Sequence, residues 1–182
     1  MGFFAARRRD ERGAVVPMVA IMMTVLLGVT AFAVDIGHQR VERRDVQAVA
    51  DMIALDASRQ LDGRTQAVIK ATSTWRAGIA QSVARNSNLA PLPTVTVQQQ
   101  QEVARATVAG SPMVVEVVMG VLDESGAFTT TPYPEVPTAV KVTVKSSVDY
   151  VFAPGGGTVS RSAVAMSESQ ACFKIGSYAA GF

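Results

Sequence analysis

The sequence of 182 residues contains one cysteine, Cys172, and one histidine, His38. A lone cysteine cannot form a disulfide within the chain, and this pair cannot supply a typical zinc site or a Cys/His nucleophile. Charged residues make up only 18% of the chain, apolar residues make up 48%, and the mean hydropathy is +0.23. This composition excludes a disordered tail and a coiled coil, and the length excludes a large multidomain enzyme.

Motifs for catalysis and phosphate binding are also missing. No serine lies in a G-x-S-x-G elbow, and the glycines at 155–157 are not followed by the Lys-Ser/Thr pair of a phosphate loop. The net charge of +2 arises in residues 1–12, where four arginines face two acids, so no basic nucleic-acid face is predicted. We expect no enzymatic activity, no catalytic residue, no cofactor, no metal, no nucleic-acid partner and no small-molecule substrate.

A long apolar run lies near the amino terminus. Residues 13–34 carry no charge, and as a helix they would rise about 33 Å, the thickness of a bilayer core. The arginines before the run predict a cytoplasmic basic tail at 1–12, a transmembrane helix at 13–34 and an extracytoplasmic remainder. The expected topology is therefore a single pass through a membrane, with the amino end in the cytoplasm.

Cleavage of this run is the competing interpretation. Ala31-Phe32-Ala33 fits a signal-peptidase sequence. However, signal-peptide apolar regions are typically about 7–15 residues long, and the helical pattern here continues past Val34 without a break. These features favour a retained anchor.

Beyond the run, the period of the apolar residues predicts helices and then strands. Helical spacing continues to Leu61 and resumes after Thr65, a candidate helix cap, so a helical stalk or hairpin is expected over 35–86. Two prolines predict a linker at 87–94, whereas 98–110 fit no single pattern. Alternating or valine-rich segments predict strands at 94–97, 113–122, 139–148 and 158–166.

The expected fold class is therefore α+β. A long N-terminal transmembrane and stalk helix and a second helix would precede a small antiparallel β-rich exterior domain over 95–182. The glycines at 155–157 are interpreted as a hairpin turn, and Trp75 as a core anchor of the second helix. Cys172 is interpreted as a small buried apolar residue, with an intermolecular disulfide as the alternative.

The segment around the end of the apolar run carries a recognisable motif. Arg12-Gly13 opens the run, Ala33-Val34-Asp35-Ile36-Gly37 closes it, and Arg43-Arg44-Asp45-Val46-Gln47-Ala48-Val49-Ala50-Asp51 follows. Over about residues 12–61 this pattern resembles the amino-terminal segment of TadG-like and TadE-like proteins of the Flp, or tight adherence, pilus-assembly system. The sequence departs from that family at Met52, Ile53 and Asp56, where small residues are usual.

The resemblance implies which residues serve assembly. The motif positions carried over to this chain are Gly13, Asp35, Gly37, Arg43, Arg44, Gln47, Ala50, Asp51, Ile53 and Ala54. The implied role is that of a membrane-anchored structural or assembly component, minor pilin-like or accessory, of a Tad/Flp-type pilus or a related surface-export system. The implied location is the bacterial inner membrane, with the carboxyl-terminal domain outside the cytoplasm. Its partners would be the lipid bilayer and other pilus-assembly membrane proteins, or a second copy, contacted through the N-terminal helix. The alternative is a secreted or tethered module that binds an extracellular ligand.

Processing and single residues allow further expectations. Prepilin cleavage after Gly13 would place Met18 at the fifth mature position, where pilins usually carry a glutamate, so an uncleaved anchor is expected. Asp35 is interpreted either as an intermolecular contact or as a carboxylate that marks the start of the headgroups. The arginines Arg40, Arg43 and Arg44 would bind lipid phosphates or form a solvated face with nearby acids.

Overall fold

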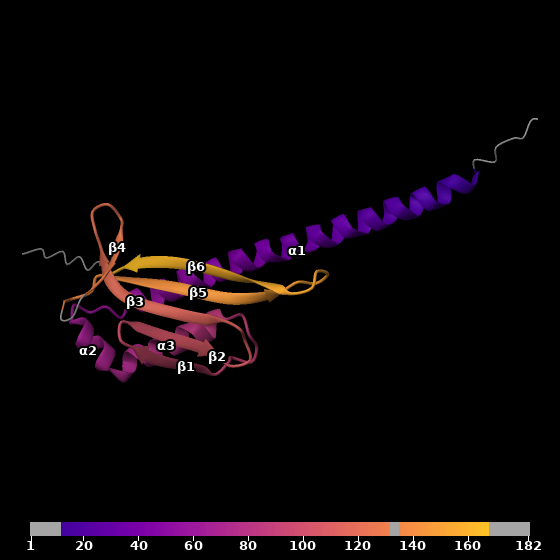
Figure 1. Ribbon diagram of the computed structural model, residues 1–182. Coiled ribbons are helices and arrows are strands. Elements are labelled where there is room, and N and C mark those ends of the chain that lie inside the picture. Colours follow the sequence, from indigo (N-terminus) through magenta and orange to yellow (C-terminus); the bar gives the residue numbers. More distant parts are fainter. Residues whose placement is uncertain (1–11, 132–134, 168–182) are drawn as a thin grey trace, which may run out of the picture.

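The computed structural model describes residues 12–131 and 135–167, so Cys172 and the tail before Arg12 lie outside the described residues (Figure 1). The fold is α+β, as predicted from the sequence. Three helices precede the sheet: α1 (Arg12–Ser58), α2 (Gln66–Ala71) and α3 (Ser73–Asn86). The strands are β1 (Val95–Gln100), β2 (Val103–Val108), β3 (Val114–Leu122), β4 (Phe128–Thr130), β5 (Ala139–Asp149) and β6 (Gly156–Met166).

Helix α1 is one continuous element of 47 residues. It begins in the apolar run and continues into the head of the protein, defined here as residues 46–167, without a break at the predicted membrane boundary. The chain reverses soon after Ser58, at Gly63, whose φ of +79° is strained for any residue with a side chain. The apolar run and the segment that packs in the head are therefore parts of one helix.

The second predicted helix is instead two helices. Thr72 separates α2 from α3 with ψ of 139°, and its hydroxyl donates a hydrogen bond to the Ile69 carbonyl at 2.7 Å. Such local bonding of a threonine hydroxyl competes with the continuing helix, which explains the break. Thr65 does precede α2, but its side chain makes no capping hydrogen bond.

The strands form one antiparallel sheet with the order β1-β2-β3-β5-β6. The short strand β4 pairs with the carboxyl end of β3, at residues 120–122. The ambiguous segment 98–110 is a hairpin in which Gln100 pairs with Val103. Gln101 sits in the turn with φ of +49°. The polar glutamine run is therefore mostly strand, and alternate residues of β1 remain exposed.

The helices cover one face of the sheet. The head end of α1 lies along β5 and β6, α3 lies along β1 and β2, and the two helices touch (Figure 1). Valines at alternate positions of β3 and β5 face this layer, because successive strand residues point to opposite faces. The core combines three groups: Val46, Val49, Ala50, Ile53, Ala54 and Ala57 from α1; Trp75, Ile79 and Val83 from α3; and the inward sheet residues Val115, Val117, Met119, Val140, Val142 and Val144.

The three departures from the family pattern have different surroundings. Ile53 is completely buried in the core, whereas the neighbouring Met52 is 56% exposed. Asp56 binds α3, where the buried Ser82 hydroxyl donates to its carboxylate at 2.7 Å and Arg85 approaches at 3.2 Å. The packing partner of this stretch of α1 is therefore the protein's own head.

Candidate functional site

The amino half of α1 projects away from the head (Figure 1). Between Val15 and Val34 its large apolar side chains are 44–71% exposed. By length and composition this is the described helix that could cross a membrane. Water disfavours so much uncovered apolar surface, so this half of the helix fits a single-pass membrane anchor.

A carboxylate joins the helix to the sheet where the apolar run ends. Asp35 is 4% exposed and accepts hydrogen bonds from the backbone N–H groups of Val151, Phe152 and Ala153, at 2.8, 3.2 and 2.9 Å. One turn further along α1, the Gln39 side-chain amide donates to the Tyr150 hydroxyl at 2.7 Å. We call this arrangement the Asp35 clamp; it holds the turn between β5 and β6 against α1.

The clamp also sets the charge state of Asp35. Burial raises the pKa of this carboxyl, but the three backbone donors from Ala153, Val151 and Phe152, together with the charge of His38, lower it by more. The pKa of Asp35 therefore lies below its ordinary value, and the group is ionised at neutral pH. Hydrogen bonds to an ionised acceptor are stronger than those between neutral groups.

Glycines allow the hairpin to fit the helix. Gly155, in the turn, has φ of +100°. A Cβ added to Gly157 would lie 2.8 Å from the Gln39 amide nitrogen and 3.2 Å from the Tyr150 hydroxyl. The turn predicted at 155–157 lies earlier in the structure, at residues 150–155, because Gly156 and Gly157 already belong to β6. The missing side chain of Gly157 leaves room for Gln39.

The structure gives Asp35 an intramolecular role that neither sequence interpretation included. Its partners are 116 to 118 residues away in the chain. Gly37 has no corresponding contact, because a Cβ there would meet nothing within 4 Å in the described structure. Of Asp35 and Gly37, only Asp35 therefore makes contacts within the described part of one copy that explain its place in the motif.

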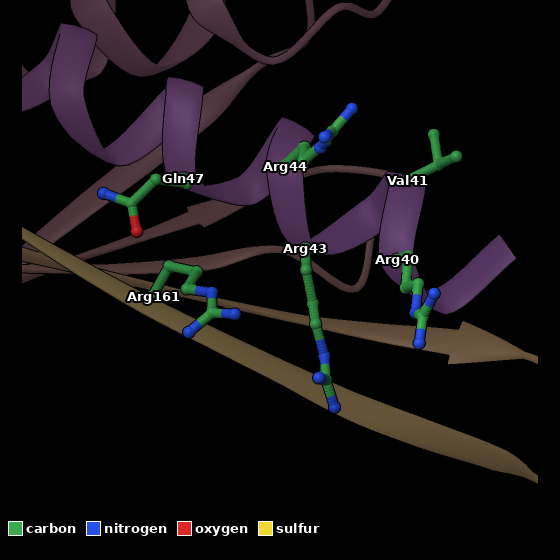
Figure 2. Close-up of a pocket in the computed structure, with 6 residues that line it drawn as sticks. All are labelled: Arg40, Val41, Arg43, Arg44, Gln47 and Arg161. Carbon is green, nitrogen blue, oxygen red and sulfur yellow. The ribbon is translucent and has the colours of Figure 1, made fainter. Parts of the chain in front are cut away.

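A basic surface follows the clamp along α1. Arg40, Arg43 and Arg44 surround an open depression of about 670 Å³ together with Arg161 from β6, Val41 and Gln47 (Figure 2). Figure 2 shows Arg40 and Arg43 extending to one side of the helix and Arg44 to the other. Within the described part of the chain, none of these four arginines forms an ion pair, so the predicted pairing with nearby acids is not seen.

The remaining motif positions divide between surface and core. The Gln47 amide donates to the Asp51 carboxylate at 2.9 Å and reaches the Ser162 carbonyl at 3.4 Å. Ala50, Ile53 and Ala54 are at most 1% exposed, inside the head. Gly13 is the second residue of α1. The motif is thus spread along one helix, and the structure does not gather it into a single cluster.

Sequence reasoning missed the residues of the hairpin that complete the site: Gln39, Tyr150, Val151, Phe152 and Arg161. One signal was available, because the apolar residues Val151-Phe152-Ala153 stand directly before Pro154-Gly155, where a turn normally carries polar residues. Among the described residues, no group of three His, Cys, Asp or Glu side chains could hold a metal ion.

Comparison with known proteins gives one match. Residues 13–51 match a family model described as Tad, putative Flp pilus-assembly TadE/G-like. No curated protein and no solved structure matches the chain. The matched segment includes the apolar run, Asp35 and the first residues of α1 that are buried in the head, Val46, Val49 and Ala50. It ends before the first strand. The matched family is a pilus-assembly family and not an enzyme family. Residues 13–51 are thus similar to the TadE/G-like family, as the motif predicted, and this similarity supports a component associated with a Tad-type pilus.

Proposed function

We propose that this protein is a membrane-anchored structural component of a Tad-type pilus or a related surface-export system, with a minor pilin-like or accessory role. The single observation that carries the proposal is α1 itself. One helix exposes apolar side chains over its amino half and forms part of the head's core over its carboxyl half. Because this helix is continuous, it would fix the position of the head relative to the membrane by packing alone, without a chemical reaction.

The amino half supplies the lateral contacts in this proposal. Its apolar side chains are uncovered, and lipid or the apolar helices of neighbouring proteins can pack against them. Because residues 14–34 carry no carboxylate, packing and not charge pairing would hold such neighbours. The partners proposed are other pilus-assembly membrane proteins or further copies of this chain.

The proposed location is the inner membrane, with the amino end in the cytoplasm and the head outside. The support is the distribution of charge, since four arginines precede the apolar run and Asp35 follows it. Positively charged flanks favour the cytoplasmic side of a membrane helix. We also propose that the anchor stays uncleaved, because a mature chain starting after Gly13 would carry Met18 at its fifth position and no carboxylate in the apolar run to pair with its new amino terminus.

A replacement of the anchor tests this function. In a strain that lacks the protein, piliation is measured after supplying either the natural chain or a chain whose residues 14–34 are replaced by a leucine helix of equal length. The natural chain should restore surface pili. The chain with the leucine helix should reach the membrane with a folded head but should not restore surface pili, because its helix presents different side chains to neighbouring helices.

Three results would contradict the proposal in whole or in part. Normal piliation in the deletion strain would remove the pilus role and favour the ligand-binding alternative. A soluble mature chain starting near Val34, seen by intact-mass spectrometry, would remove the anchor. Full rescue by the leucine helix would leave an anchored protein but would exclude specific packing by the amino half.

A further inference from the structure

The turn between β5 and β6 presents an apolar tip. Val151 is 62% exposed and Phe152 is 61% exposed, and they are adjacent in the segment Tyr150–Gly155, which we call the hairpin tip. Turns on a soluble surface are usually rich in Gly, Pro, Asn, Asp and Ser. Two exposed apolar side chains at this place need a partner.

The clamp fixes the level of the hairpin tip along α1. Asp35 directly follows Val34, the last residue of the uncharged run, and it binds the N–H groups of residues 151–153. The tip therefore lies beside the turn of α1 at which the span ends. Figure 1 shows the β5–β6 hairpin reaching from the head toward the exposed half of the helix.

The backbone N–H groups of residues 150–153 in the tip are already paired. Three consecutive N–H groups bind one carboxylate, and the Tyr150 hydroxyl accepts a hydrogen bond from Gln39. Moving an unpaired backbone N–H group out of water is costly, so this pairing lowers the cost of bringing the tip into the headgroup layer. Aromatic side chains such as those of Tyr150 and Phe152 also suit the boundary between lipid and water.

We propose that the hairpin tip is a second membrane contact, in which Val151 and Phe152 lie in the headgroup layer beside the end of the span. The partner is the surface of the same lipid bilayer that α1 crosses. The proposal rests on the membrane anchor in the proposed function. A single span leaves the tilt of the protein relative to the membrane open, whereas a second contact beside the span fixes the side of α1 toward which the head tilts.

Nitroxide labels test the depth of the tip in the full chain. Single cysteines are placed at Phe152, at Met23 in the apolar run and at Val164 in β6, each with Cys172→Ser. Val164 is the matched control, because it is also exposed, at 42%. It pairs with Lys141, which lies seven residues along β5 from Val148, the partner of Gly157 next to the hairpin tip. That separation is about 23 Å.

Each labelled protein is placed, one copy per disc, in nanodiscs of phosphatidylethanolamine and phosphatidylglycerol. The ratio of collisions with oxygen to collisions with a water-soluble nickel chelate reports depth in the bilayer. It should be highest at Met23, and severalfold higher at Phe152 than at Val164. Adding Asp35→Asn should lower the ratio at Phe152 and leave Met23 and Val164 unchanged, because it weakens the clamp alone.

Each adverse result has a distinct meaning. A ratio at Phe152 equal to that at Val164, with Met23 still deep, would overturn the hairpin contact and leave the anchor intact. A water-exposed Met23 would overturn both the anchor and the contact. Shielding of Phe152 that appears only with two copies per disc would assign the tip to a second copy and so overturn the lipid proposal.

Discussion

The two halves of α1 have the same secondary structure and different surroundings. From Val15 to Val34 the large apolar side chains are exposed. Further along the helix a stripe is buried against α3 and the sheet, made of Val46, Val49, Ala50, Ile53, Ala54 and Ala57. The difference lies in the pattern: an uninterrupted apolar run has no polar face to show to water, whereas a stripe has one. Apolar content alone therefore does not identify a core, because the run suits a bilayer and the stripe suits a folded head.

The largest effect is expected from a charge in the buried half. Ile53→Asp places a carboxylate where the side chain is fully buried, so the free energy of unfolding of the head should fall by about 3–5 kcal/mol. Denaturation in detergent, followed through Trp75 fluorescence, measures this. The control is Met52→Asp, one residue earlier and 56% exposed, which should change the unfolding free energy by no more than about 0.5 kcal/mol. Equal effects at the two positions would show that the stripe is not buried.

The same substitution in the exposed half should act on the membrane and not on the head. Leu26→Asp places the charge near the middle of the apolar run and should raise the apparent free energy of insertion by about 2.5–3.5 kcal/mol. Glycosylation mapping of residues 13–34 in a translocation assay measures it. Head stability should match that of the natural chain. A destabilised head with unchanged insertion would reverse the assignment of the two halves.

A smaller and local effect is expected at the junction of the halves. Asp35→Asn removes the charge from the clamp, so hydrogen exchange at the amides of Val151, Phe152 and Ala153 should speed up by about tenfold. Exchange of the β5 amides should not change. Unchanged protection of the hairpin tip would mean that the clamp contributes little to its order.

The natural chain should show the matching pH dependence. The pKa of Asp35 in the folded protein lies below its ordinary value of 3.8, so ionised Asp35 stabilises the clamp above about pH 4. This contribution is lost as the pH falls through the folded-state pKa. Protection of the hairpin tip, corrected for intrinsic exchange, should therefore decline on acidification in the natural chain and be flat over the same range in Asp35→Asn.

Periodicity was enough to predict much of the architecture. The helical spacing of Val46, Ile53 and Ala57 indicated the stripe, and the alternation at Val140, Val142 and Val144 indicated a central strand. The break at Thr72 was missed, because apolar spacing continues across it while the hydroxyl bonds locally to Ile69. The hairpin at 98–110 was unassigned, since its glutamines carry neither period clearly.

By itself, the sequence determined the apolar run, the α+β order of the elements and the resemblance of residues 13–51 to the TadE/G-like family, because each depends on composition or spacing along a continuous stretch of chain. The tertiary structure decided which residues meet. It brought Asp35 to the backbone of residues 151–153 and Arg161 to the arginines of α1. These meetings depend on strand order and on how the helices cover the sheet, and the local pattern of a single chain segment carries no record of either.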